Sequence, residues 1–232
     1  MYITKKFIPI IALGLSLSFL LSANPDKTNP NKTTHRWIMD SRTHQVDMNM
    51  YSKQRLFENS KRPEIVIDIS EQRLYLVQNK LVLKSYPISS SKFGEGSIEN
   101  SFKTPLGMHR IKEKIGEDVE ENSIFISRVD TQKKANIIKD TFDSDNDFVT
   151  SRILWLDGME EGKNKGQGID SYDRYIYIHG TQEEGLIGTK ASHGCIRMFN
   201  NDVIELFKQV QEGTNVLILS LIHISEPTRL RR

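Results

Sequence analysis

Residues 63–218 contain a series of short runs rich in β-branched and aromatic residues, and residues that favour turns bound each run. Such runs are typical of β-strands, because these side chains pack well on a pleated, half-buried surface. The pattern therefore constrains the chain to a fold built mainly on β-sheet. The predicted strands are 64–69, 73–78, 81–89, 108–111, 123–129, 152–156, 175–179 and 215–219, the first three forming a hairpin or meander.

One helix is predicted near the C-terminal end of this region, in the segment FNNDVIELFKQVQEG (199–213). We expect Asn200 or Asn201 to cap its start and Gly213 to end it. The fold class is therefore mainly β, of mixed α+β type, with one clear helix. The apolar positions at helical spacing, which we assign to core packing, are Val203, Leu206, Phe207 and Val210.

Composition excludes several classes of protein. The 232 residues include 32 Lys and Arg against 30 Asp and Glu, a formal net charge of +2, which argues against a strongly basic nucleic-acid-binding protein. A single Cys excludes an internal disulfide framework and a multi-cysteine zinc cluster. The apolar share of 37% is enough for a buried core.

The N-terminal segment 1–23 has the pattern of an export signal. Lys5 and Lys6 precede an apolar run from Phe7 to Leu21, and the small residues Ser22 and Ala23 follow it. The run is shorter than the roughly 20 residues of a membrane-spanning helix. Because Leu21 is large for its position before a cleavage site, the alternative of an uncleaved N-terminal anchor stays open.

The rest of the chain divides into a polar linker or extension at 24–62, a domain at 63–218 and a tail at 219–232. The tail begins LSLIHISEPTR, which looks like a translated sequencing adapter, so we predict that it is not native; a natural basic tail is the alternative. Three polar segments, two of which contain glycines, interrupt the predicted strands, and long loops of this kind are usually functional lids or disordered. They are 89–107, 139–148 and 158–174.

The residues that suggest chemistry lie between 175 and 198. Cys195 follows Gly194, and His179 ends a predicted strand sixteen residues earlier. An unpaired thiol in an exported protein is a liability unless it has a function. Thiol nucleophiles act as thiolates, so we expect a neighbouring base or cation to lower the pKa of Cys195, with His179 better placed than His193.

A zinc site is an alternative, because His179, His193 and Cys195 are all zinc-ligand types. The His-x-Cys spacing is tight and no fourth ligand stands out, so the sequence favours nucleophilic catalysis without a metal or other cofactor.

These residues resemble the signature of the L,D-transpeptidase catalytic domain, the YkuD-like family. The resemblance rests mainly on two motifs, His179-Gly180-Thr181 and Ser192-His193-Gly194-Cys195-Ile196-Arg197-Met198. Two upstream segments, IVIDISEQRLYLV and Thr104-Pro105-Leu106-Gly107, are also similar to the family, so the resemblance covers about 63–218. It implies a sandwich-like or barrel-like mixed sheet. It also implies a periplasmic or cell-wall enzyme whose partners are peptidoglycan stem peptides, with no nucleic acid, and with membrane contact only through an N-terminal anchor.

The resemblance implies a role for each residue. Cys195 is the expected nucleophile and His179 the general base, oriented by the Gly180 carbonyl. Gly194 and Cys195 N–H groups form the expected oxyanion hole, and Ser192 and His193 shape the loop. Arg197 is expected to bind a substrate carboxylate or, equally, to make a structural ion pair.

The implied reaction is acyl transfer from a stem tetrapeptide through a thioester, with release of D-alanine and formation of a 3→3 cross-link. Water as acceptor gives an L,D-carboxypeptidase, and a protein lysine as acceptor attaches a lipoprotein to the wall. A wall-binding module without activity is a further alternative, against which the intact His179 and Cys195 argue.

Overall fold

The computed structural model describes residues 37–39, 45–47, 61–79 and 81–220. The predicted export signal, most of the predicted linker and residues 221–232 of the predicted tail lie outside the described residues. Two short strands, β1 (Trp37–Met39) and β2 (Gln45–Asp47), pair with each other in antiparallel orientation. Within the described part of the chain, no helix is both long enough and apolar enough to cross a membrane.

The predicted mainly β fold is confirmed, and each predicted run contains a strand. The predicted strand at 123–129 is wrong in one respect. It ends at Ile126, because Ser127 and Arg128 adopt positive φ values of 47° and 69° and turn the chain into a strand that the sequence did not predict. The strands are β3 (Glu64–Asp68), β4 (Arg73–Gln78), β5 (Leu81–Pro87), β6 (Gly107–Ile115), β7 (Ser123–Ile126), β8 (Val129–Lys134), β9 (Val149–Gly158), β10 (Tyr177–Gly180), β11 (Ile196–Met198) and β12 (Asn215–Leu219).

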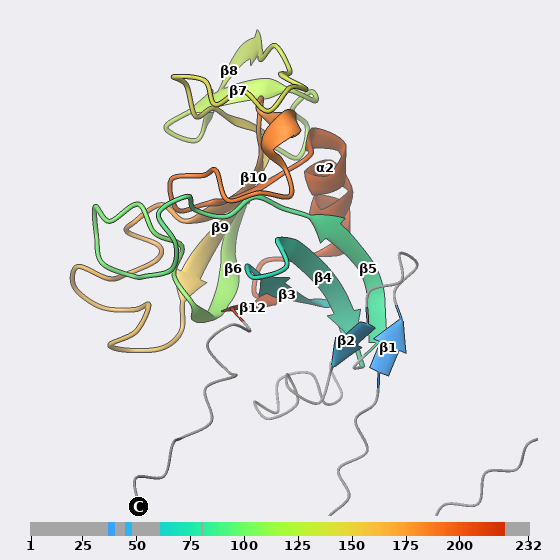
Figure 1. The fold of residues 1–232 in the computed structure, drawn as a ribbon, viewed down its shortest axis with the longest axis vertical. Helices are drawn as coiled ribbons and strands as arrows, with labels where there is room; N and C mark the ends of the chain where they lie inside the picture. Colours follow the sequence, from blue (N-terminus) through green and yellow to red (C-terminus); the bar gives the residue numbers. More distant parts are fainter. Residues whose placement is uncertain (1–36, 40–44, 48–60, 80, 221–232) are drawn as a thin grey trace, which may run out of the picture. The chain divides into compact units, whose positions relative to one another are not determined.

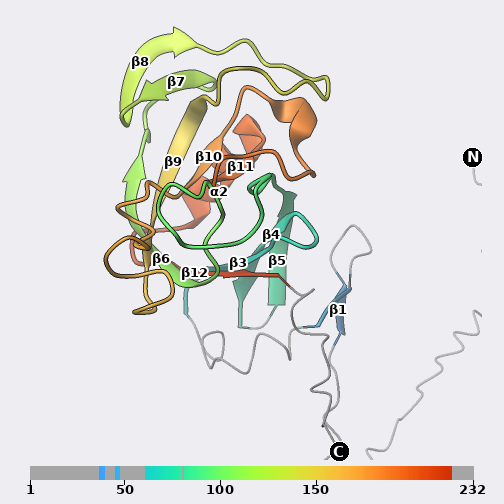
Figure 2. The same ribbon diagram turned by 60° about the vertical axis from the view of Figure 1, so that its left-hand side comes forward.

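These ten strands form one sheet in the order β11-β10-β9-β6-β12-β3-β4-β5, with the β7–β8 hairpin joined to β9 (Figures 1 and 2). Only two neighbouring pairs are parallel, β10 with β11 and β12 with β3. The two ends of the sheet meet just after β5, where Ser89 and Arg197 exchange two backbone hydrogen bonds of 2.9 Å. This bridge joins the edges of an open sheet and makes the fold barrel-like.

The one α-helix of the described residues, α2 (Asn200–Gln209), packs on β9 and β10. Its buried residues Val203, Leu206 and Phe207 join the main apolar cluster, together with residues of the sheet such as Ile178 and Ile196. The predicted assignment of this apolar stripe to the core is therefore confirmed. The helix fixes the strand pair β10–β11 from one side of the sheet.

The predicted caps of α2 are wrong. Phe199 occupies the N-cap position, and the Asn200 N–H instead donates to the Glu184 carboxylate at 2.9 Å. Asn200 is buried and its side chain serves other partners, accepting hydroxyl hydrogen bonds from Thr150 and Ser151 at 2.6 Å. At the other end the helix stops at Gln209, four residues before Gly213.

The Lys114 ammonium completes the end of α2. It donates to the carbonyls of Phe207 and Val210 at 2.7 and 2.8 Å, and so satisfies acceptors that a helix terminus leaves without intrahelical partners.

The three polar segments between the strands all have defined positions against the sheet. The segment 158–174 is held by His109 of β6, whose side chain is fully buried. His109 Nδ1–H donates to the Gly107 carbonyl at 3.0 Å, and Nε2 accepts from the Ser171 hydroxyl at 2.9 Å. Burial lowers the pKa of His109 to about 4, so the ring is neutral at physiological pH.

Replacing His109 with Gln is expected to reduce the pH dependence of stability. The unfolded chain binds a proton at this His near pH 6.5, whereas the folded chain does so only near pH 4. Folded-state stability therefore falls as the pH drops from 6.5 towards 4, and this one residue contributes about 2–3 kcal/mol to the loss by pH 4.5. Urea denaturation of both proteins at pH 7.0 and 4.5 measures the difference. If both proteins lost the same amount of stability between pH 7.0 and 4.5, His109 would not be a cause of the pH dependence.

Candidate active site

The parallel pairing of β10 and β11 brings Cys195 and His179 together. Ile178 lies opposite Ile196 and His179 lies opposite Arg197. Side chains alternate between the faces of a sheet, so Cys195, at the start of β11, lies on the same face as His179 and diagonally across from it. The 15-residue segment between the two strands doubles back, as the sequence required. The two predicted chemical groups are therefore neighbours on one face.

A backbone carbonyl holds the His179 ring, which is 2% exposed. Its Nδ1 lies 2.6 Å from the Gly180 carbonyl oxygen. Because a carbonyl only accepts, Nδ1 carries the proton and Nε2 of the neutral ring is an acceptor. Gly180 has no room for a side chain: a Cβ there would lie 2.5 Å from Asn200 Oδ1 and 2.9 Å from the Thr150 carbonyl oxygen. The family resemblance implied this role for the Gly180 carbonyl.

The pKa of the Cys195 thiol is raised, whereas the sequence analysis expected it to be lowered. Burial raises the pKa of Cys195 to about 12, and the carboxylate of Asp147 adds to the increase. The Tyr177 N–H, which donates to Sγ at 3.4 Å, and the guanidinium groups of Arg197 and Arg174 oppose it without cancelling it. The expected resting thiolate is therefore wrong: at neutral pH Cys195 is a thiol, and Sγ–H donates to the Tyr175 carbonyl at 3.3 Å.

Burial likewise lowers the pKa of His179, against the opposing effects of Asp147 and of the Gly180 carbonyl. Thiol and imidazole are thus both neutral at rest. The base has a free proton-accepting nitrogen, and the nucleophile keeps its proton until attack.

The loop before β11 is shaped by Ser192 and Gly194. The Ser192 hydroxyl donates to the Cys195 carbonyl at 2.6 Å, and the Gly194 N–H donates a long bond of 3.3 Å to the same hydroxyl oxygen. Thr104, from the opening polar segment, donates to the Gly194 carbonyl at 3.0 Å. Of the two predicted oxyanion donors, Gly194 N–H is thus engaged with Ser192. The described residues supply no acceptor for the Cys195 N–H.

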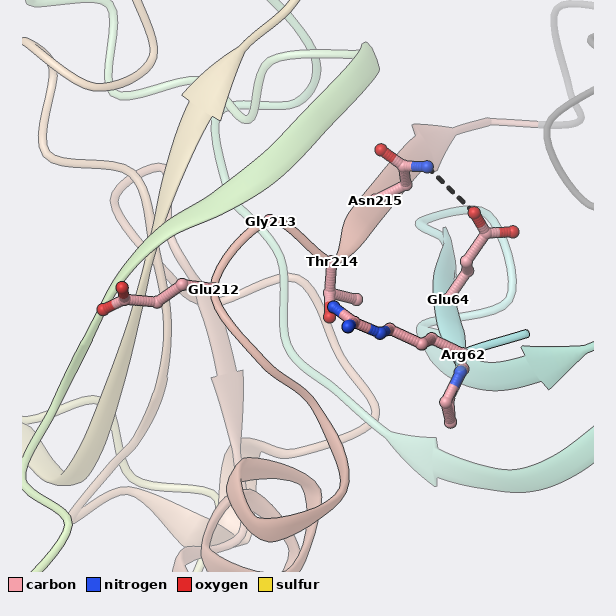
Figure 3. A pocket seen from close by; sticks show the side chains of 7 residues that line it. Arg62, Glu64, Glu212, Gly213, Thr214 and Asn215 are labelled. Atoms are coloured by element: carbon pink, nitrogen blue, oxygen red, sulfur yellow. Dashed lines mark hydrogen bonds between the residues drawn. The ribbon is translucent and has the colours of Figure 1, made fainter. Parts of the chain in front are cut away.

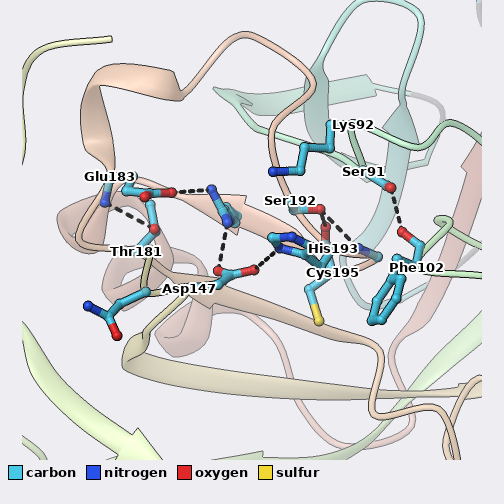
Figure 4. Close-up of polar contacts among 12 residues, drawn as sticks. Ser91, Lys92, Phe102, Asp147, Thr181, Glu183, Ser192, His193 and Cys195 are labelled. Atoms are coloured by element: carbon cyan, nitrogen blue, oxygen red, sulfur yellow. Dashed lines mark hydrogen bonds and ion pairs between the residues drawn. The ribbon is translucent and has the colours of Figure 1, made fainter. Parts of the chain in front are cut away.

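Arg197 lies inside the domain, with a side chain 1% exposed. Its Nη1 pairs with Glu183 at 2.7 Å and its Nη2 with Asp147 at 2.7 Å (Figure 4). Of the two roles left open by the sequence, this geometry fits a structural ion pair. A guanidinium held between two carboxylates inside the protein is not placed to receive a carboxylate from solvent.

His193 is tied to the same charge cluster. Its Nδ1 lies 2.8 Å from the second oxygen of Asp147, and its ring packs between Phe93 and Phe102, with centroid distances of 5.7 and 5.9 Å. These contacts attach His193 to Asp147 and to two aromatic rings beside Gly194.

Asp147 is the residue that sequence reasoning missed. It comes from the segment 139–148, which has no regular secondary structure. Its carboxylate pairs with both His193 and Arg197, and its charge acts to raise the pKa of His179. The Arg197 guanidinium holds the pKa of Asp147 below its ordinary value, against an opposing effect of partial desolvation. The segment is itself fastened to Glu183, which accepts from the Ser144 N–H at 2.7 Å. The segment 139–148 contains four Asp residues, and nothing in the local sequence pattern distinguished Asp147 from the other three.

The described residues contain no group of three or more His, Cys, Asp or Glu that could hold a metal ion. A separate cavity of about 150 Å³ opens where β3 and β12 begin, lined by Arg62, Glu64, Thr214 and Asn215 among others (Figure 3). In it the Asn215 amide donates to Glu64 at 2.8 Å. None of the predicted site residues lines this cavity.

The sheet thus presents a thiol and a carbonyl-oriented His on adjacent parallel strands. The family model of the L,D-transpeptidase catalytic domain, YkuD, matches residues 62–218. The chain belongs to this family.

Curated relatives match over short segments. YqjB of Bacillus subtilis (strain 168), named as an L,D-transpeptidase, is 51% identical over 47 residues, which cover 20% of this chain and 27% of that protein. YkuD of the same organism is 56% identical over 41 residues, covering 18% and 25%. The matches thus span about a quarter of the relatives' own length.

Solved structures similar to this chain include Bdellovibrio bacteriovorus Bd1075, with 17% identity and a TM-score of 0.44 over 71% of this chain and 52% of that one. An L,D-transpeptidase from Mycobacterium smegmatis has 18% identity and a TM-score of 0.40, covering 68% and 58%.

Replacing Asp147 with Asn is expected to lower the pKa of His179 further and to destabilise the fold by about 1–3 kcal/mol, because a buried guanidinium loses one of its carboxylates. An NMR titration of the His179 ring and urea denaturation measure the two effects. Asp143→Asn is the matched control, since Asp143 pairs with Lys92 at the surface; its effect should stay within about 0.5 kcal/mol. An unchanged His179 pKa together with unchanged stability would show that Asp147 neither affects His179 nor balances the charge of Arg197.

Proposed function

We propose that this protein is a cysteine-dependent L,D-transpeptidase that joins peptidoglycan stem tetrapeptides by 3→3 cross-links and releases D-alanine. Membership of the family supports the reaction class. The observation that carries the proposal is the pairing of a neutral His179, whose Nε2 is an acceptor, with Cys195 on the same face of the sheet.

In the first half-reaction, His179 Nε2 takes the proton of the Cys195 thiol as sulfur attacks the carbonyl of the diamino acid at position three. The carbon–nitrogen bond to the terminal D-alanine then breaks, and the imidazolium returns the proton to the leaving amine. An amide and a thiol thus become a thioester and an amine. Since both groups are neutral at rest, proton transfer accompanies attack and no preformed ion pair is needed.

The tetrahedral intermediate carries a negative oxygen that needs hydrogen-bond donors. The Cys195 N–H is the donor that the surrounding residues leave available, and Gly194 N–H joins it when its long bond to Ser192 is exchanged for the oxyanion. Asp147 stabilises the imidazolium that forms during the transfer.

In the second half-reaction an amine of another stem loses a proton to His179 and attacks the thioester. The carbon–sulfur bond breaks, and the proton returns to sulfur, which restores the thiol. Water in place of the amine gives an L,D-carboxypeptidase, and a protein lysine gives attachment of a lipoprotein. All three outcomes share the same acyl-enzyme, so the nucleophile and base are common to them.

We also propose that the protein acts outside the cytoplasmic membrane, in the periplasm or cell wall, where its substrate lies. The basic residues Lys5 and Lys6 before a short apolar run support export. The same segment, if retained, supplies an anchor to the inner membrane.

Incubation of the purified protein with disaccharide-tetrapeptide tests the function. Mass spectrometry is expected to find the cross-linked dimer and free D-alanine, and Cys195→Ala should reduce both at least about a thousandfold. His179→Ala should slow turnover by about 10²–10⁴-fold, the range of general acid–base catalysis. Tripeptide without dimer would indicate the carboxypeptidase. If Cys195→Ala still becomes acylated by a carbapenem, as measured on the intact protein, the nucleophile is another residue.

The raised pKa of Cys195 gives a separate prediction. Alkylation by iodoacetamide needs the thiolate, so the rate is expected to be low at pH 7 and to rise with pH without levelling off below about pH 10. Mass spectrometry of the alkylated protein between pH 6 and 10 measures this profile. A plateau reached near neutral pH would show a thiolate held ionised at rest.

A further inference from the structure

Tyr175 has a backbone conformation that is unusual for its residue type. Its φ is 57°, in the left-handed region, where the Cβ of an L-residue comes too close to the backbone. Gly enters this region at no steric cost, whereas a bulky residue there is strained and stays only where its surroundings hold it. The side chain of Tyr175 is 52% exposed, so burial of the ring does not explain the conformation.

The turn that ends at Tyr175 shows how the conformation arises. The Ile176 N–H donates to the Ser171 carbonyl at 3.1 Å, and the Tyr175 N–H donates to the Tyr172 carbonyl at 3.0 Å. These two bonds form the pattern of a Schellman motif, in which the residue of left-handed conformation is usually Gly. Tyr175 occupies the position of that Gly. The turn therefore fixes the backbone of Tyr175 just before β10 begins.

The fixed backbone places the Tyr175 carbonyl at the sulfur of Cys195. Its oxygen accepts the Sγ–H at 3.3 Å, and the Tyr177 N–H donates to Sγ at 3.4 Å. Within the described residues these are the hydrogen bonds of Sγ, and none joins it to His179. The resting thiol therefore donates to a backbone carbonyl and not to the base. A carbonyl that accepts from the thiol favours the neutral form.

Two neighbours hold the Tyr175 ring. Its centroid lies 5.6 Å from that of Trp155, and the guanidinium carbon of Arg128 lies 4.9 Å from the Trp155 centroid and 5.1 Å from the Tyr175 centroid. Arg128 belongs to the turn between β7 and β8, so it reaches Tyr175 from another part of the sheet. Aromatic and cation–π contacts of this kind offset part of the backbone strain.

We propose, building on the proposed role of Cys195 as nucleophile, that Tyr175 is a positioning residue that keeps the resting thiol away from the base. Its left-handed backbone fixes the carbonyl that accepts the thiol proton. Attack then begins with a rotation of the Cys195 side chain, which exchanges this carbonyl for His179 Nε2 as acceptor. No covalent bond changes in this step. The S–H bond breaks only when His179 takes the proton and sulfur attacks the substrate carbonyl.

Two substitutions separate the effect of the backbone from that of the ring. Tyr175→Gly and Tyr175→Val both remove the ring. Gly adopts the left-handed conformation without strain, whereas the β-branched Val disfavours it more strongly than Tyr does. We expect Tyr175→Gly to keep the carbonyl at the sulfur and Tyr175→Val to move it away. A difference between the two variants therefore comes from the backbone.

Infrared spectroscopy of the S–H stretch measures the hydrogen bond directly. The chain has one Cys, so no other thiol contributes to the band. The frequency of the band depends on the acceptor of the thiol proton. Wild type and Tyr175→Gly are expected to share one frequency, and Tyr175→Val should differ from both. A common frequency in all three proteins would overturn the proposal.

His179→Ala gives a second reading of the same band that does not depend on how well Tyr175→Val folds. Because the resting thiol donates to Tyr175, removal of the imidazole is expected to leave the S–H frequency unchanged. A shifted band would show that the thiol donates to His179 at rest, and it would overturn the proposal.

Alkylation by iodoacetamide at pH 8 measures the effect on reactivity. Tyr175→Val is expected to react about 3- to 10-fold faster than Tyr175→Gly, the value of one hydrogen bond that favours the neutral thiol. Equal rates would overturn the proposal. Gln132→Val is the matched control for strain, because Gln132 is an exposed residue of β8 with a φ of 59°. It should retain the wild-type band and rate, and a change equal to that of Tyr175→Val would also overturn the proposal.

These outcomes are distinguishable from failure of the proposed function. The S–H band and the alkylation rate do not depend on transpeptidation, so a negative result for Tyr175 leaves the proposed function standing. A wild type that forms no acyl-enzyme with the tetrapeptide or with a carbapenem would overturn the proposed function, and with it the release of the thiol to His179 during attack.

Discussion

The parallel pairing of β10 with β11 is the constraint on which the site depends. It requires the chain to leave β10 at Gly180, double back and return in the same direction, and it places Cys195 diagonally across from His179. The helix α2 and the bridge between Ser89 and Arg197 hold this short pair from two sides. A three-residue strand such as β11 has few ladder hydrogen bonds of its own, so its position comes from these neighbours.

Burial determines the chemistry of the pair. Removing thiol and imidazole from water disfavours their charged forms, which raises the pKa of Cys195 and lowers that of His179. The charge is carried instead by Asp147, Arg197 and Glu183, which lie around the pair and make ion pairs with one another. The resting site thus stays neutral at its centre, and the Asp147 carboxylate opposes the lowering of the His179 pKa without reversing it.

The local pattern predicted the strands well, because alternating and β-branched runs determine which segments can be half-buried in a sheet. It failed where side chains had distant partners. Asn200 is a good capping residue by type, yet Thr150 and Ser151 of β9 bind its side chain and Glu184 takes over the cap. The turn at Ser127 and Arg128, with positive φ at two residues other than Gly, carries no strong sequence signal.

For the site, the residues between His179 and Arg197 suggested the nucleophile and base candidates, because both residue types have particular chemistry and lie close in sequence, while the role of the Gly180 carbonyl came from the family resemblance. Only the tertiary structure revealed the ion pairs of Asp147 and the burial of Arg197. Each of these depends on long loops whose residues meet partners far along the chain. The protonation state of Cys195 also depends on the tertiary structure, because burial of the thiol away from water raises its pKa.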